Sequence, residues 1–404
     1  MRKTSRRMAG LIAVAGMAGA LAAANPVLTP GVWKDITPQG SSGDVWMVKI
    51  SQKNPNYLYV GTGGSGLYAS TDGGSTYRKS NVADYIAGLE IDPNDATHLY
   101  VGGWQNGDFW ESTDAGVTWT KRPLIGSPDI GEITTDPSDF NHILVSWHYI
   151  YDDEGSFCES TDGGKSWKAI FIPGVQGASS KGVHFLYQPS LHIGDRNTWL
   201  ITTEAAGFFR TSDAGATWTN VSTNNGLTGG LKGIYYTKGG VLYTGGQPCP
   251  VRSIDNGVTW ESICGNMGSW YYTNMIGDGN KLYVGVAYPS AAYYTTPENG
   301  DGKTWTVGQT LVQGSGTWPF AFDTANHIMY MASGPAVFAL KSLGTSATSA
   351  TAQRTAVSGT KIRNEHLICY SGRMPDASAR LYDVKGQKLA GRSGALQAAI
   401  IDQR

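Results

Sequence analysis

Carboxylates and large aromatic side chains share several short segments of this chain, and together they could bind and cleave a sugar polymer. Hydrolysis of a glycosidic bond uses two carboxylates, about 5–5.5 Å apart for retention or about 6.5–9.5 Å apart for inversion. Asp84 and Asp129 occupy equivalent positions in successive segments, and Glu204 lies in a later one. We predict these three as the catalytic candidates, and the sequence does not say which pair converges.

Aromatic rings and polar groups near these acids could hold the substrate. Flat aromatic faces stack on sugar rings, and carboxylates and amides bind the hydroxyl groups. The densest cluster is the segment 147–154, and the alternative for several rings, Trp318 among them, is ordinary packing between sheets. The predicted substrate-binding residues are Trp46, Tyr85, Trp104, Asp108, Trp147, Tyr149, Asp152, Trp270 and Trp318.

An eight-residue phrase of the form Ser-x-Asp-x-Gly-x-Thr-Trp recurs along the chain and indicates its architecture. Repetition every 40–50 residues is typical of propellers and arrays. The Asp can accept N–H bonds within its own turn, the Gly permits a positive φ, and the last ring can wedge between sheets. Each copy has one carboxylate, so we expect a scaffold role. The copies lie at 70–77, 112–119, 160–167, 211–218 and 253–260, with a worn copy ending at Trp305.

This phrase resembles the Asp-box, or BNR repeat, of sialidase, Vps10 and glycoside hydrolase family 74 β-propellers. The resemblance implies an all-β, seven-bladed propeller over 25–342, built of four-stranded antiparallel blades with Asp-box hairpins. The segment 32–36 resembles those that follow the boxes, so we expect this N-terminal strand to complete the last blade and close the ring. Six blades with a stray N-terminal strand is the alternative. The expected blade starts are Val45, Ala87, Gly131, Val183, Gly233, Thr273 and Phe320.

The strand order of a propeller predicts where the candidate residues gather. Turns after the first and third strand of each blade, marked by Asp-Pro and by the box, occupy one face. The other loops surround the channel on the opposite face. All the candidate acids and aromatic rings fall in this second set of loops or beside it. We therefore expect the functional site at the mouth of the channel.

Two enzyme families carry comparable boxes. Sialidases hold the sialate carboxylate with three arginines, whereas most arginines here flank the boxes, so a sialidase is not favoured. Xyloglucanases of family 74 alternate Asp-Pro turns and boxes as this chain does, although their cleft lies between two propellers that each give one catalytic Asp. We predict a carbohydrate-active propeller that hydrolyses a polysaccharide in a xyloglucanase-like way. The alternatives are a non-catalytic glycan-binding propeller and a protein-binding propeller of the assembly-factor or receptor type.

The two ends of the chain point to export. Residues 1–24 combine early basic residues with an apolar stretch, which is typical of a bacterial signal peptide and predicts a secreted or cell-surface protein. Residues 343–356 form a Ser/Thr/Ala-rich linker. The segment 379–389 within the small β segment 357–404 resembles the C-terminal sorting domain of type IX secretion, which implies a secretion machinery as partner. A small accessory module is the alternative.

Composition restricts the remaining partners. The net charge of −1 gives no basic footprint for nucleic acid, and we expect no membrane span, cofactor or metal. Four cysteines are too few to form a disulfide framework. Cys249 and Cys264 flank the fifth box, and they either pair in an oxidising compartment or remain free thiols.

Overall fold

The structure is a computed structural model of the chain. It describes residues 25–342 except for 84, 105–107, 124–129, 137, 148–155, 176–179, 186–195, 204–205, 223–232, 238, 269, 287–292, 310 and 312–316. The chain divides into two compact units, Met1–Ser346 and Ala347–Arg404, and the described residues belong to the first. The predicted signal peptide, linker and sorting tail lie outside the described residues.

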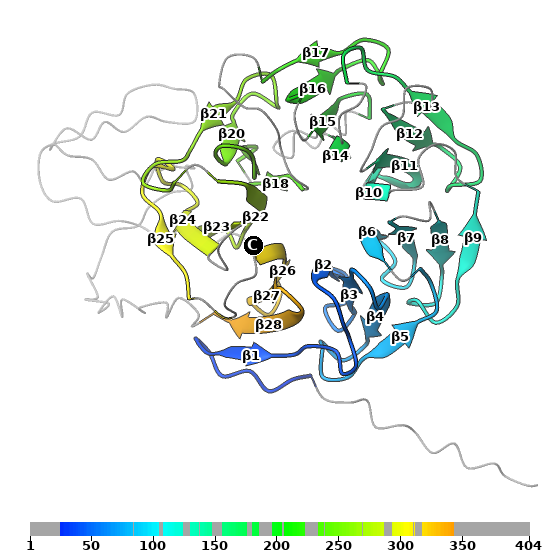
Figure 1. Cartoon of the computed structure of the whole chain (residues 1–404), viewed down its shortest axis with the longest axis vertical. Coiled ribbons are helices and arrows are strands. Elements are labelled where there is room, and N and C mark those ends of the chain that lie inside the picture. The colour runs from blue at the N-terminus through cyan, green and yellow to red at the C-terminus, as the bar shows by residue number, and fades with distance from the viewer. Residues whose placement is uncertain are drawn as a thin grey trace, which may run out of the picture. The chain divides into compact units, whose positions relative to one another are not determined.

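Seven four-stranded antiparallel sheets form a ring, as Figure 1 shows. The described residues contain strands, turns and bends but no helix, and hence none that could span a membrane. The prediction of a seven-bladed all-β propeller is confirmed, and the six-bladed alternative is wrong.

The blades follow one another along the chain, each running from its innermost to its outermost strand. Blade 1 holds β2 (Val45–Ile50), β3 (Leu58–Thr62), β4 (Leu67–Ser70) and β5 (Arg78–Ser80), and blade 2 holds β6 (Ile86–Ile91), β7 (Leu99–Gly103), β8 (Phe109–Ser112) and β9 (Thr120–Arg122). Blade 3 holds β10 (Ile130–Asp136), β11 (Asp139–Trp147), β12 (Phe157–Ser160) and β13 (Lys168–Ile170), and blade 4 holds β14 (Ser180–Phe185), β15 (Trp199–Thr203), β16 (Phe208–Thr211) and β17 (Thr219–Asn220). Blade 5 holds β18 (Tyr235–Tyr236), β19 (Leu242–Thr244), β20 (Val251–Ser253) and β21 (Glu261–Ser262), and blade 6 holds β22 (Tyr272–Gly277), β23 (Lys281–Val286), β24 (Tyr293–Pro297) and β25 (Thr306–Val307). Blade 7 holds β26 (Thr317–Asp323), β27 (Ile328–Ser333), β28 (Ala336–Lys341) and β1 (Trp33–Asp35).

The first strand of the chain closes the ring. β1 pairs antiparallel with β28, with Lys34 opposite Ala339. This pairing covers an edge of β28 that would otherwise present unpaired backbone groups. The prediction that the N-terminal strand completes the last blade is therefore confirmed.

Each copy of the repeated phrase forms a tight turn whose Asp binds the backbone of the same turn. Asp72 shows the pattern: its Oδ1 accepts the Thr76 N–H at 2.9 Å, and its Oδ2 accepts the Thr76 hydroxyl at 2.7 Å. The Ser70 hydroxyl donates to Asp72 Oδ1 and accepts the Gly74 N–H, both at 2.8 Å. Corresponding bonds link Asp114, Asp162, Asp213 and Asp255 to their own turns. The expected local hydrogen bonding is confirmed, and we call these five segments the box turns.

The last aromatic ring of a box turn packs against the preceding blade. Trp167 of blade 3 lies edge-on to Phe109 of blade 2, with 5.1 Å between the ring centroids. Trp260 of blade 5 meets Phe208 of blade 4 in the same way, at 5.3 Å. The core is accordingly a series of apolar clusters between blades, which confirms the expected wedge role of these rings.

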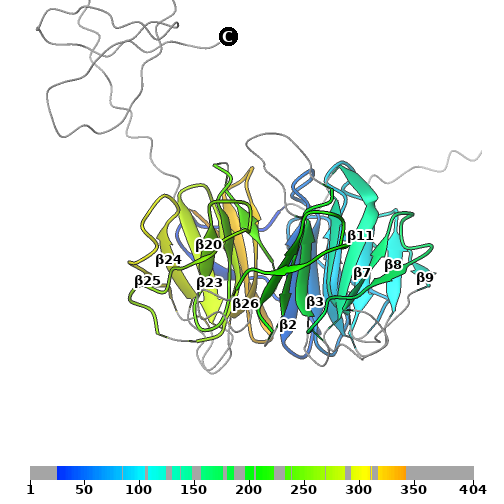
Figure 2. The same ribbon diagram turned by 90° about the horizontal axis from the view of Figure 1, so that it is seen from above.

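The innermost strands face the centre of the ring, and most of them begin with a bulge. Figure 2 shows the ring from its side, with the innermost strands β2 and β26 labelled. A register shift falls between Val45 and Met47 of β2, and shifts occur near the first residues of β6, β10, β14, β22 and β26 as well. We call the face of the ring at which these strands begin the mouth. A bulge redirects a side chain, so the mouth is where the fold can aim side chains at a ligand.

Candidate functional site

Three aromatic rings meet at the mouth between blades 1 and 2. Trp46 lies in the bulge of β2, Tyr85 directly precedes β6, and Trp104 directly follows β7. The ring centroids are 4.4 Å apart for Trp46 and Trp104, 5.8 Å for Trp46 and Tyr85, and 6.3 Å for Tyr85 and Trp104. All three residues are half-buried, so each keeps part of its surface in contact with solvent. This aromatic cluster unites three of the predicted substrate-binding residues.

The backbone beneath the aromatic cluster holds the rings in place. Gly63 and Tyr85 form an isolated β-bridge between the two blades, and the Trp104 N–H donates to the Tyr85 carbonyl at 2.9 Å. A Cβ at Gly63 would lie 2.3 Å from the Trp46 ring, so only glycine lets the indole rest on this backbone. Gly63 has a role in the site that the sequence analysis did not identify.

Charged groups lie near the aromatic cluster at two positions. Asp44 is exposed directly before β2, and its carbonyl accepts the Gly63 N–H at 2.8 Å. Asp108 pairs with the Lys121 ammonium of β9, so its carboxylate is committed to the outermost strand of blade 2. Asp44 is therefore an exposed acid two residues before Trp46, and it was not among the predicted site residues.

An ion pair joins blades 1 and 2 along the innermost strands. Lys49 Nζ of β2 lies 2.8 Å from Glu90 Oε1 of β6. Burial disfavours the charge on Lys49, but the carboxylates of Glu90 and Glu132 outweigh it and raise the pKa of Lys49 above its usual value. The sequence contained a signal for this ion pair, because Lys49 and Glu90 each stand at the fifth position of an otherwise apolar strand.

The other predicted site residues are spread between the core and the surface. Trp147 at the end of β11 is fully buried and packs in an apolar cluster with residues such as Trp199. Trp270 is exposed before β22, and Trp318 belongs to β26 by its backbone. The catalytic candidates Asp84, Asp129 and Glu204 and the binding candidates Tyr149 and Asp152 lie outside the described residues.

At least one sequence neighbour of each catalytic candidate is described and lies at the mouth. Asp84 directly precedes Tyr85 of the aromatic cluster. Asp129 directly precedes the first residue of β10, and Glu204 directly follows the last residue of β15. The role of all three acids stays a prediction.

Two of the cysteines are paired. Cys249 and Cys264 form a disulfide within blade 5, which decides between the two alternatives that the sequence left open. Cys158 is a free, buried thiol, and burial raises its pKa well above the usual value, so it is unreactive. Among the residues that the structure describes, no group of His, Cys, Asp and Glu could hold a metal ion.

The arginines of the ring serve to connect its turns and strands. Arg78 donates to the Gly116 carbonyl of the next box turn at 2.7 Å, and Arg210 donates to the Asn256 carbonyl at 3.0 Å. Arg122 pairs with Glu111, Arg196 with Asp136, and Arg252 with Glu261. All five arginines named thus have partners within the ring.

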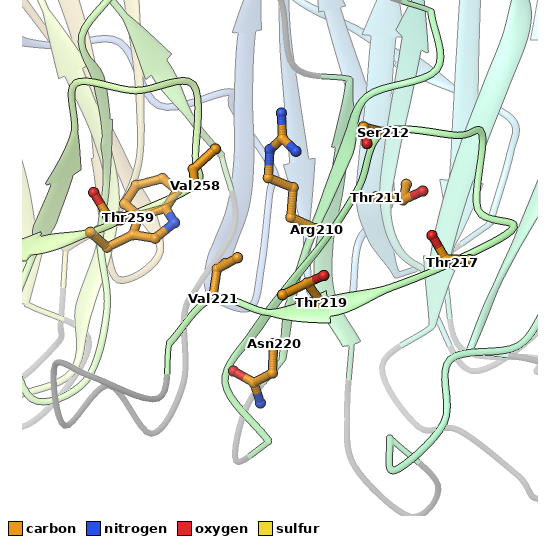
Figure 3. Close-up of a pocket in the computed structure, with 10 residues that line it drawn as sticks. Arg210, Thr211, Ser212, Thr217, Thr219, Asn220, Val221, Val258 and Thr259 are labelled. Atoms are coloured by element: carbon orange, nitrogen blue, oxygen red, sulfur yellow. The ribbon is translucent and has the colours of Figure 1, made fainter.

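A groove of about 340 Å³ lies away from the mouth, between the outer parts of blades 4 and 5 (Figure 3). Hydroxyl-bearing side chains and the stem of Arg210 form most of its wall, and Val221 and Val258 add apolar surface. It contains none of the predicted site residues. The remaining lining residues are Thr211, Ser212, Thr217, Thr219, Asn220, Thr259 and Trp260.

Curated relatives of the chain are xyloglucanases. The xyloglucanase Xgh74A of Acetivibrio thermocellus is 28% identical over 157 residues, a match that covers 29% of this chain and 18% of the relative. A xyloglucanase of a Paenibacillus species is 24% identical over 271 residues, covering 51% of this chain and 25% of the relative. The chain thus spans about a quarter or less of the length of these relatives. No protein-family model matches the sequence.

Solved structures share the fold. The GH74 xyloglucanase from Xanthomonas campestris superposes with a TM-score of 0.60 at 15% identity, covering 78% of this chain and 54% of that one. YCF48 from Cyanidioschyzon merolae superposes with a TM-score of 0.57 at 14% identity, covering 77% of this chain and 98% of that one. At these identities the likeness concerns the propeller fold, which hosts unrelated functions.

Proposed function

We propose that this protein binds a polysaccharide of the xyloglucan type across the mouth of its channel and hydrolyses it. The observation that carries this proposal is the aromatic cluster of Trp46, Tyr85 and Trp104. Its half-buried aromatic residues offer stacking surfaces, and Asp44, an exposed acid two residues before Trp46, can accept bonds from sugar hydroxyls. The curated xyloglucanase relatives support the same class of substrate.

The hydrolytic step would use two carboxylates from the set Asp84, Asp129 and Glu204. One carboxylic acid protonates the leaving oxygen, and a carboxylate attacks the sugar carbon or activates a water molecule. Asp84 is the foremost candidate because it adjoins Tyr85, whose ring stands in the aromatic cluster. A one-ring enzyme would have to draw both acids from the same propeller.

Export is part of the proposal. The leader 1–24 would direct the chain across the inner membrane, and the tail 357–404 would engage a secretion machinery. A polysaccharide substrate outside the cell requires such a route, and the disulfide between Cys249 and Cys264 suits an oxidising compartment.

The test is a polysaccharide panel of xyloglucan, xylan, pectin and mannan, scored for new reducing ends and for retention of the protein. We expect release of reducing ends from xyloglucan. Trp46→Ala and Trp104→Ala should each weaken retention roughly tenfold, as expected for loss of about 1.4 kcal/mol of stacking. Phe171→Ala is the control, because Phe171 is 54% exposed outside the site. Failure of the wild-type protein to bind any polymer would overturn the proposal.

The same panel separates binding from catalysis. Asp84→Asn, Asp129→Asn and Glu204→Gln should leave retention unchanged, and the two true catalytic variants should lose about 10²–10⁴-fold in rate. If wild-type protein cleaves but none of these variants slows it, the assignment of the acids is wrong. Retention without cleavage would make the protein a glycan-binding propeller.

A second candidate function is peptide binding. A YCF48 structure bound to a D1 peptide matches with a TM-score of 0.56 at 14% identity, and 99% of that single-ring chain is covered. That near-complete coverage contrasts with the 54% covered in the family 74 enzyme. If the polysaccharide panel is negative, capture of an extended peptide at the mouth becomes the function to test.

A further inference from the structure

Trp270 is the one exposed tryptophan among those whose side chains the structure describes. It is 44% exposed, and it lies two residues before β22, where the segment from blade 5 reaches the mouth of blade 6. Burial would stabilise a large apolar ring, so a ring left in solvent at the mouth is available for contact with a ligand.

The segment 264–272, which carries Trp270, is anchored to blade 5 and to blade 6. The Cys249–Cys264 disulfide ties it to the loop between β19 and β20, and the Trp270 N–H donates to the Pro248 carbonyl of that loop at 3.1 Å. Asn266 accepts the Trp305 N–H at 2.7 Å and donates to the Trp305 carbonyl at 3.1 Å, which fixes the segment to blade 6.

Glycine and tyrosine complete the anchorage next to the ring. A Cβ at Gly268 would lie 2.6 Å from Trp270 Nε1, so the indole rests directly on this backbone. The Tyr272 hydroxyl donates to the Gly268 carbonyl, and its N–H donates to the Gly246 carbonyl at 3.1 Å. The exposed ring is thus pre-organised, which lowers the ordering cost of binding.

We propose that Trp270 is a second sugar-stacking platform, and that one polysaccharide chain crosses the mouth between it and the aromatic cluster. This inference rests on the proposed function. β6 and β22 lie on opposite sides of the centre of the ring in Figure 1, and Trp270, like Tyr85, lies next to the start of its blade's innermost strand. Two platforms on one ligand act together, so affinity should rise steeply once the sugar chain is long enough to reach both.

The test compares binding of xyloglucan polymer and of a short xyloglucan oligosaccharide to wild type, Trp46→Ala, Trp270→Ala and the control Phe171→Ala. Trp270→Ala should lower affinity for the polymer roughly tenfold and change affinity for the oligosaccharide less than twofold. Trp46→Ala should weaken both, and Phe171→Ala neither. If Trp46→Ala weakens polymer binding and Trp270→Ala does not, this platform is absent while the proposed function stands. If the wild type binds neither ligand, the proposed function itself fails.

Reduction of the disulfide provides an independent readout. Dithiothreitol should lower the polymer affinity of the wild type, because the segment 264–272 loses one anchor, and should leave Trp270→Ala unchanged. The Cys249→Ser, Cys264→Ser double variant should behave like the reduced wild type. Near-ultraviolet circular dichroism checks that each protein stays folded. Equal effects of reduction on wild type and Trp270→Ala would overturn the idea that the disulfide acts through this ring.

Discussion

At the scale of single residues, the aromatic cluster depends on a glycine as much as on its rings. Trp46 can lie against the β-bridge to blade 2 only because Gly63 has no Cβ, which would approach the indole to 2.3 Å. The sequence showed the rings, but it could not show this contact, because it joins two residues of different strands and depends on the bulge in β2.

Gly63→Ala is therefore expected to displace the Trp46 ring and to weaken polymer binding roughly tenfold, close to the effect of removing the ring. The matched control is Gly239→Ala, because the nearest atom to a Cβ there would be Thr237 Oγ1, at 3.7 Å, which is ordinary van der Waals contact. Titration of both variants with xyloglucan, followed by tryptophan fluorescence, measures the effect. Equal affinities in the two variants would contradict the role given to Gly63.

Burial is the residue property that the sequence predicted least well. Trp147 stands among aromatic and acidic residues in the sequence, yet its side chain lies in an apolar cluster that reaches Trp199 of blade 4. Which rings face a neighbouring blade depends on the packing of two sheets, and a single segment does not contain that information.

At the scale of elements, the box turns were predictable because their stabilising bonds lie within eight residues. Asp162 accepts the hydroxyl of Ser166 at 2.6 Å and its N–H at 2.9 Å, and these bonds lower the pKa of Asp162 to about 2. Hydrogen bonds from Thr211 and Thr217 lower the pKa of Asp213 to about 2 in the same way. The carboxylates thus stabilise the folded turns only while they are charged.

This linkage predicts a loss of stability in acid. The folded pKa values lie below the value near 3.9 of an unfolded Asp, so the stabilisation is fully present above about pH 4 and is lost as the pH falls through about 2. Urea unfolding at several pH values from 5 to 2 measures it. Asp162→Asn should be less stable than wild type at pH 6 and should show a shallower decline in acid. Parallel curves for the two proteins would contradict the assignment.

At the scale of the whole molecule, repetition made the ring predictable. A regular repeat predicted the number of blades, and the resemblance of 32–36 to segments after the boxes predicted the closing strand, both of which the structure shows. The site was less predictable, because it combines loops from blades 1 and 2 whose relative placement follows from closure of the ring. The repeated segments therefore predict the architecture, whereas the loops that differ from blade to blade, such as those with Trp46, Tyr85 and Trp104, determine where a ligand could bind.

The closing strand should be essential for a stable single ring. β1 covers the edge of β28, and Trp33 lies edge-on to Tyr293 of blade 6, with 6.1 Å between the ring centroids. A chain that spans 37–342 should therefore unfold at lower urea concentration than one that spans 27–342, and it should associate as its concentration rises, because the bared edge can pair with a second copy. Chemical unfolding and light scattering measure the two effects.

A synthetic peptide of residues 27–36, added in excess, should restore the unfolding midpoint by pairing with β28. Identical midpoints for the two chains without the peptide would show that the ring closes without its N-terminal strand.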